Sequence, residues 1–133
     1  MIDIGGKYLR SDLIKKIVIE SKEVDINQET IDKVEENYKF LESFIKDKII
    51  YGINTGFGPM AKYKIDADHH IELQYNLIRS HAAGSGNPLG VEYCRAAVLA
   101  RLNSLLLAQS GIHPELIELL KAFLNNDVCP VLY

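Results

Sequence analysis

The residue of this chain with the clearest chemical potential is a tyrosine at the start of a loop with three glycines in eight residues, Tyr51-Gly52-Ile53-Asn54-Thr55-Gly56-Phe57-Gly58. Glycine loses much conformational freedom on folding, so such a cluster indicates positive φ, close approach to a ligand or hinge motion. A free phenol has a pKa of about 10, so a tyrosine that acts as a base needs donors to stabilise its phenolate, and loop amides can supply them. From these residues alone, a tyrosine packed beside a tight turn is the simpler interpretation.

Three further polar residues are candidates for the same chemistry. Asn54 and Thr55 belong to the loop, where their side chains could orient Tyr51 or cap the turn, and turn formation ranks first. His81 lies in Arg79-Ser80-His81-Ala82-Ala83-Gly84, near the end of an expected helix. A protonated histidine at a helix carboxyl end is favourable by about 0.3–1 kcal/mol, which by itself explains the residue.

Phosphate and metal sites are not predicted. The spacing of Gly52, Gly56 and Gly58 is Gly-x-x-x-Gly-x-Gly, with no Gly-Lys-Ser/Thr after it, which differs from a phosphate-binding loop. Adjacent His69 and His70 would project about 100° apart on a helix, unsuited to sharing a metal. The only two cysteines, Cys94 and Cys129, lack metal-like spacing and are expected to be buried thiols rather than a disulfide framework.

Composition places the chain among ordinary globular proteins. It has 133 residues, 47% hydrophobic and 25% charged, which argues against disorder and against a coiled coil. The net charge of −3 excludes the basic footprint of a nucleic-acid binder. Neither a secretion signal nor an apolar run of about 20 residues is present, so we expect no membrane association and a cytoplasmic location.

The first half of the chain predicts two helices and little strand. Residues 11–20 favour a short helix with Ser11 as N-cap, and residues 24–26 an extended piece. Asn27 is expected to cap the clearest amphipathic helix, whose apolar positions are Ile31, Val34, Tyr38, Leu41 and Ile45. A short strand is expected at residues 48–51, followed by an irregular stretch to about Ile65.

The second half predicts three more helices. One begins at Asp66 or Asp68, has Ile71, Tyr75, Ile78 and Ala82 on one side, and is broken by residues 84–88. The next, residues 89–109, is apolar nearly all round, so we expect it to be buried by partners in a longer chain or in other subunits. Gly111 is expected to end it. Pro114 then suits the first turn of a last helix with apolar face Leu116, Leu119, Leu120 and Phe123.

Several motifs in one order resemble the amino-terminal part of the histidine, tyrosine and phenylalanine ammonia-lyases and related aminomutases. They are the loop at residues 51–58, the segment at 73–86, Ala100-Arg101-Leu102-Asn103, Ser110-Gly111-Ile112-His113-Pro114-Glu115 and the ending at 124–131. The resemblance implies a mainly α fold, the helical start of a helical-bundle enzyme with at most a small β element. Residues 1–133 would form a single amino-terminal helical region.

The resemblance also implies a chemistry. The parent protein would eliminate ammonia from an aromatic amino acid, histidine to urocanate first, with a tyrosine ammonia-lyase or aminomutase as the alternative. Tyr51 would be the base that takes the β-proton, and Gly52, Asn54, Thr55, Gly56 and Gly58 would shape its loop. His81 would line the pocket for the substrate side chain, where a neutral imidazole can bond a polar ring and is left unsatisfied by a phenyl.

The expected electrophile is a methylidene-imidazolone group formed from an Ala-Ser-Gly tripeptide downstream of Tyr133, with no dissociable cofactor. No Ala-Ser-Gly occurs in this chain, which therefore resembles an inactive fragment of a homotetrameric enzyme. The ending Val131-Leu132-Tyr133, where many relatives have a second proline, keeps open another class, a non-catalytic helical interaction module. The gene beyond Tyr133 separates the two, because an Ala-Ser-Gly there supports the enzyme and a stop codon supports the module.

Overall fold

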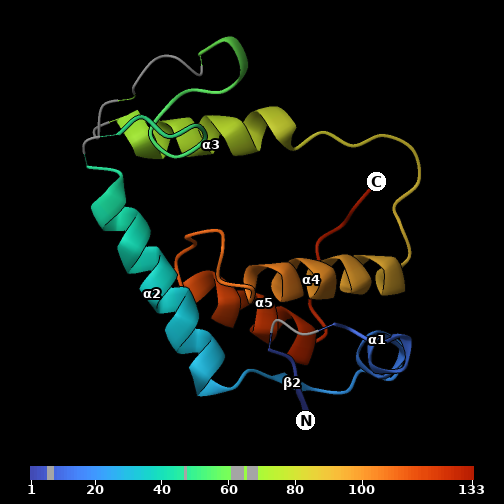
Figure 1. The fold of residues 1–133 in the computed structure, drawn as a ribbon. Helices are drawn as coiled ribbons and strands as arrows, with labels where there is room; N and C mark the ends of the chain where they lie inside the picture. The colour runs from blue at the N-terminus through green and yellow to red at the C-terminus, as the bar shows by residue number, and fades with distance from the viewer. Residues whose placement is uncertain (6–7, 47, 61–64, 66–68) are drawn as a thin grey trace. The chain divides into compact units, whose positions relative to one another are not determined.

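The structure, a computed structural model, describes residues 1–5, 8–46, 48–60, 65 and 69–133. Within these ranges the elements are α1 (Ser11–Val18), α2 (Gln28–Phe44), α3 (His70–His81), α4 (Val91–Leu105) and α5 (Glu115–Asn125), two strands, β1 (Ile2–Asp3) and β2 (Val24–Asp25), and the 3-10 turn η1 (Gly58–Met60). Helices dominate and the strands are two residues long, so the predicted mainly α fold with a small β element is confirmed (Figure 1).

The chain forms two compact units. We call Met1–Leu41 with Gly86–Tyr133 the core unit, and Glu42–Ser85 the loop unit. The family-level expectation of a single region over residues 1–133 stays a prediction.

The core unit is built around α4, which packs against α5 and α1. Leu99, Leu102 and Leu105 of α4 are at most 1% exposed. They belong to one cluster with side chains of α1, β2, α2 and α5, among them Ile17, Val24, Val34, Ile117 and Leu124. Tyr93 of α4 is 64% exposed. The described helices of the core unit therefore do not cover α4 on all sides, as its apolar sequence led us to expect.

A parallel strand pair ties the amino terminus to the core unit. Ile2 and Ile4 donate their N–H groups to the carbonyls of Glu23 and Asp25, over 2.7 and 2.9 Å. The Asn125 side chain closes the far side of β2, since its amide both accepts from and donates to the Val24 backbone, over 2.8 and 2.9 Å. The extended piece predicted at residues 24–26 is thus a strand, whereas its partner β1 was not predicted.

The two predicted N-caps have opposite outcomes. Asn27 directly precedes α2, and its Oδ1 accepts from both the N–H and the hydroxyl of Thr30 over 2.9 Å, which confirms the cap. The Ser11 cap is wrong, because Ser11 is already the first residue of α1. The flanking position belongs to extended Arg10, whose carbonyl accepts from Leu13 and Ile14 over 3.0 Å.

The prediction that Gly111 ends the preceding helix is also wrong, since α4 ends at Leu105. Gly111 serves a different contact. Its φ is +60°, its N–H donates to Asn37 Oδ1 of α2 over 2.7 Å, and a Cβ there would lie 2.3 Å from Leu41 Cδ2. Glycine is therefore required because the loop backbone passes directly against α2.

The expected apolar face of α5 is half right. Pro114 directly precedes the helix, and Leu120 and Phe123 pack partly buried against the core. Leu116 and Leu119, however, are 36% and 50% exposed, while Ile117 and Leu124 are buried. Apolar residues occupy two adjacent faces of this helix, so periodicity alone does not select the one that packs.

In the loop unit, α3 ends at His81, as the break expected at residues 84–88 requires. The predicted starts at Asp66 and Asp68 lie outside the described residues. The expected apolar side of α3 is open, since Ile71, Tyr75 and Ile78 are 71%, 57% and 64% exposed. Among the described residues, no helix is both long and apolar enough to cross a membrane.

Candidate functional site

The strand predicted at residues 48–51 is wrong, because a turn occupies its end. The buried Asn54 side chain reaches back over this segment, donating to the Lys48 carbonyl over 2.7 Å and accepting from the Ile50 N–H over 2.8 Å. The Ile50 carbonyl accepts in turn from the N–H groups of Ile53 and Asn54. A strand would need a neighbour for these backbone groups, whereas here the chain satisfies them locally.

Thr55 closes the second half of the turn. It is 1% exposed, accepts from the Gly52 N–H over 3.3 Å and donates to the Gly56 carbonyl over 2.9 Å. Gly52 and Gly58 have φ of +77° and +56°, a region that L side chains rarely adopt. The described hydrogen bonds of Asn54 and Thr55 therefore go to the backbone of the turn and not to the Tyr51 hydroxyl.

Tyr51 itself projects from this hydrogen-bonded turn, with 63% of the residue exposed. Its ring meets Phe57 edge to face, with ring centroids 6.1 Å apart and planes at 78°. Such pairs contribute about 0.5–1.5 kcal/mol beyond the area they bury. The phenol is thus accessible to a ligand, and the Phe57 ring lies on one side of it. Phe57 was not singled out from the sequence, although an aromatic residue between two loop glycines is a usable signal.

His81 is the last residue of α3 and bonds to its own helix. Its Nδ1 lies 2.9 Å from the Leu77 carbonyl and 3.0 Å from Ser80 Oγ, and Ser80 donates to the same carbonyl. A proton on Nδ1 satisfies that carbonyl and leaves Nε2 of the exposed ring as a hydrogen-bond acceptor. His81 thus contacts the last turn of its own helix through Nδ1, while its role as a charge at the helix end stays a prediction.

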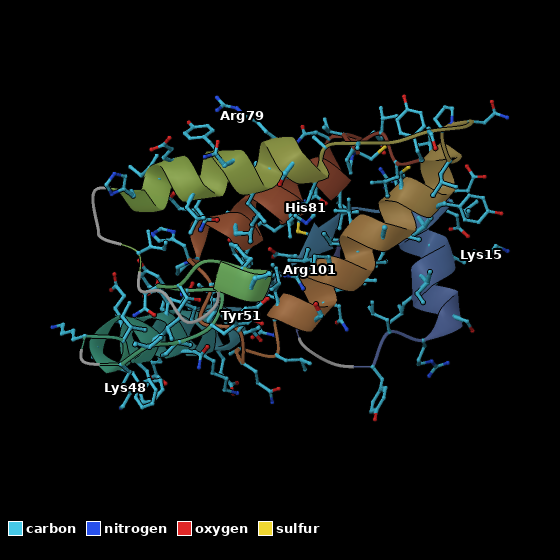
Figure 2. All side chains as sticks on the ribbon, turned by 90° about the horizontal axis from the view of Figure 1, so that it is seen from above. Lys15, Lys48, Tyr51, Arg79, His81 and Arg101 are labelled. Atoms are coloured by element: carbon cyan, nitrogen blue, oxygen red, sulfur yellow. The ribbon has the colours of Figure 1, made fainter. Side chains whose placement is uncertain are left out.

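Both principal candidates belong to the loop unit, Tyr51 on the loop after α2 and His81 at the carboxyl end of α3 (Figure 2). In the part of the chain that the structure describes, no hydrogen bond or ring contact joins them. Two cavities, of about 510 and 170 Å³, are lined by core-unit residues alone and include neither candidate. No cluster of metal-ligating side chains occurs within the described ranges.

A buried arginine in α4 was missed by sequence reasoning. The Arg95 side chain is 4% exposed, donates to the Ile17 carbonyl over 2.9 Å and to the Leu124 carbonyl over 3.3 Å, and pairs with Asp127. It thereby joins the carboxyl ends of α1 and α5. The available signal was an arginine directly before the apolar run Ala96-Ala97-Val98-Leu99. These contacts assign Arg95 to the architecture of the core unit.

The aromatic amino acid lyase family matches residues 9–133. The chain belongs to this family. It is 38% identical over 133 residues to the histidine ammonia-lyase of Bacillus subtilis and 33% identical over 132 residues to the MIO-dependent tyrosine 2,3-aminomutase of Streptomyces globisporus. The crystal structure of the tyrosine aminomutase from Streptomyces globisporus superposes on 93% of the chain with a TM-score of 0.86 and 34% identity.

The matches cover almost all of this chain but little of each relative. They span 99% and 98% of the chain, and 26% and 24% of the length of the two relatives. These matches confirm the resemblance to the aromatic amino acid lyase family that the loop at residues 51–58 and the later motifs indicate. The chain corresponds to about a quarter of such a protein.

Proposed function

We propose that the protein to which this chain belongs eliminates ammonia from an aromatic amino acid, and that histidine, converted to urocanate, is the substrate. The supporting observation is the identity of 38% over 133 residues to the Bacillus subtilis histidine ammonia-lyase.

In this proposal Tyr51 takes the β-proton of the substrate. The side chain is 63% exposed, so a bound amino acid can reach it. The turn beneath it is held by the bonds of Asn54 and Thr55 to its backbone, which fix the segment from which the phenol projects. A base must lie within hydrogen-bond reach of the proton it removes, so a fixed loop is the first requirement for this role.

The proposed electrophile is a methylidene-imidazolone group, which when present holds the substrate amine and makes the β-proton removable. The Streptomyces relative is an MIO-dependent enzyme, which supports a protein-derived group in this family. No Ala-Ser-Gly occurs among these 133 residues, so they do not form it, and we propose that it comes from a downstream part of the parent protein. The contribution of this chain is the base and one wall of the side-chain pocket.

His81 is the proposed contact for the substrate ring. With a proton on Nδ1 directed to Leu77, its Nε2 accepts a hydrogen bond from an imidazole or a phenol. The same geometry serves tyrosine, and the similarity to the Streptomyces tyrosine 2,3-aminomutase favours a tyrosine enzyme as the second candidate.

The deciding experiment offers histidine, tyrosine and phenylalanine to the full-length protein and follows the conjugated acrylate in the ultraviolet. Urocanate as the preferred product supports histidine elimination, and a β-amino acid from tyrosine supports the aminomutase. No product from any of the three substrates would overturn the proposal. We further propose a cytoplasmic homotetramer, which size-exclusion chromatography and cell fractionation of the full-length protein test.

A further inference from the structure

We infer that Phe57 is a positioning residue for Tyr51, which rests on the proposed role of Tyr51 as a base. The two rings lie edge to face, with centroids 6.1 Å apart and planes at 78°. This geometry brings the positive edge of one ring to the negative face of the other, so it favours one mutual orientation over others. Among the described interactions of Tyr51, Phe57 supplies the only ring contact.

The two rings of this contact differ in their exposure to solvent. Phe57 is half-buried, whereas Tyr51 is 63% exposed. The Phe57 backbone lies between the Gly56 carbonyl, bound by the Thr55 hydroxyl over 2.9 Å, and η1, which begins at Gly58. The more buried Phe57 ring therefore limits the positions open to the more exposed Tyr51 ring.

The Phe57 ring also lies near Gly52, the residue that follows Tyr51. A Cβ on Gly52 would lie 3.8 Å from Phe57 Cε1, in van der Waals contact, so the Phe57 ring reaches across the turn to the residue that follows Tyr51. The φ of +77° at Gly52 lies in the left-handed region, so the turn needs glycine for its backbone and not for space. Phe57 thus pairs with the Tyr51 ring and lies near Gly52.

A positioning role predicts a particular kinetic result. Displacing a catalytic group by about 1 Å costs about 100-fold in rate, while substrate binding by other groups is retained. In the full-length protein we expect Phe57→Leu to lower kcat about 10- to 100-fold and to change KM less than about threefold. Phe57→Tyr keeps the ring and should retain kcat within about threefold. The matched control is Phe44→Leu, since the Phe44 ring of the same unit contacts the Lys48 ammonium instead.

A second measurement needs no turnover. Fluorotyrosine placed at position 51 of the full-length protein reports the neighbouring ring through its ¹⁹F chemical shift. We expect the shift to move in Phe57→Leu and to stay in Phe44→Leu, with circular dichroism showing that all variants are folded.

The outcomes separate this inference from the proposed function. A ¹⁹F shift that does not move in Phe57→Leu overturns the contact, whether or not the protein is active. A shift that moves while kcat stays unchanged overturns the positioning role. A wild-type protein without ammonia-lyase or aminomutase turnover defeats both the proposed function and the positioning role, while the ¹⁹F shift still reports whether the ring contact exists.

Discussion

The core unit and the loop unit bury different kinds of side chain. Every buried hydrophobic side chain among the described residues lies in the core unit, from Ile4 to Leu124. The buried side chains described in the loop unit are those of Asn54 and Thr55, and both are polar. Burial of apolar surface contributes about 25 cal/mol per Å², whereas a hydrogen bond exchanged with water contributes a net 0.5–1.5 kcal/mol.

This difference separates stability from function. The core unit has the apolar contacts that hold a fold, while the loop unit has a specified turn and an open helix face. Segments that bind ligands come from the less stable part of a protein, because they must open and close. We therefore expect substitutions in the loop unit to change turnover and those in the core unit to change stability.

The largest expected effect is on turnover. Tyr51→Phe in the full-length protein should lower kcat about 10²- to 10⁴-fold, the usual contribution of a general base, with an unchanged melting temperature because the ring is kept. Steady-state kinetics and thermal unfolding measure both. Tyr93→Phe, which also removes a hydroxyl from an exposed tyrosine, is the control. Near-normal turnover of Tyr51→Phe would contradict the assignment.

The next effect contrasts two helices. Leu102→Ala removes a fully buried side chain of α4 and should lower the unfolding free energy of the chain by about 2–5 kcal/mol. Ile78→Ala in α3, where the residue is 64% exposed, should change it by less than about 0.5 kcal/mol. Urea denaturation of residues 1–133 measures both. Equal losses would mean that the two units are packed alike, and would contradict the difference in apolar burial between them.

A substitution of Arg95 tests whether a buried polar residue contributes to the stability of the core unit. Arg95→Met leaves the carbonyls of Ile17 and Leu124 without this donor, so we expect a loss of about 1–3 kcal/mol. The pair with Asp127 adds little to that figure, because Asp127 is 66% exposed. Arg101→Met, at an exposed position of the same helix, should stay within about 0.5 kcal/mol in the same denaturation experiment. Indistinguishable stabilities would argue against the buried contacts.

A substitution of His81 tests whether the loop unit controls the choice of substrate. His81→Leu in the full-length protein should raise kcat/KM for phenylalanine relative to histidine by about 10-fold, because no polar ring atom is left unpaired beside the phenyl group. Competition assays with the two substrates measure the ratio, and His69→Leu, an exposed residue before the other end of α3, is the control. If the ratio does not change, His81 serves only its own helix end.

The smallest effect concerns the start of α2. Asn27→Ala removes the acceptor for the Thr30 N–H and should cost about 1 kcal/mol of unfolding free energy. Asn27→Ser keeps an acceptor oxygen and should recover most of the loss in urea denaturation. A serine variant as unstable as the alanine variant would show that another contact of Asn27, such as that with Asp3, matters more.

Local patterns in the sequence predicted the features that depend on neighbouring residues. The cap at Asn27, the end of α3 before Gly84 and the glycine loop at residues 51–58 all follow from the backbone preferences of a few adjacent side chains. The motifs shared with the aromatic amino acid lyase family are of the same kind. Tyr51 and His81 could be selected as candidates from them without a structure, and their roles stay predictions.

Tertiary packing decided what depends on distant residues. Gly111 is a glycine because Leu41, 70 positions earlier, lies where its Cβ would be. Ile117 rather than Leu116 is buried because its side of α5 packs into the core cluster. The Arg95 contacts and the strand β1 likewise depend on groups far along the chain. Sequence alone thus determined the helical fold, the family and the chemical candidates, because these depend on residues that are close together along the chain. The structure alone showed how Phe57 meets Tyr51 and which side chains are buried, because contact geometry depends on the whole folded chain.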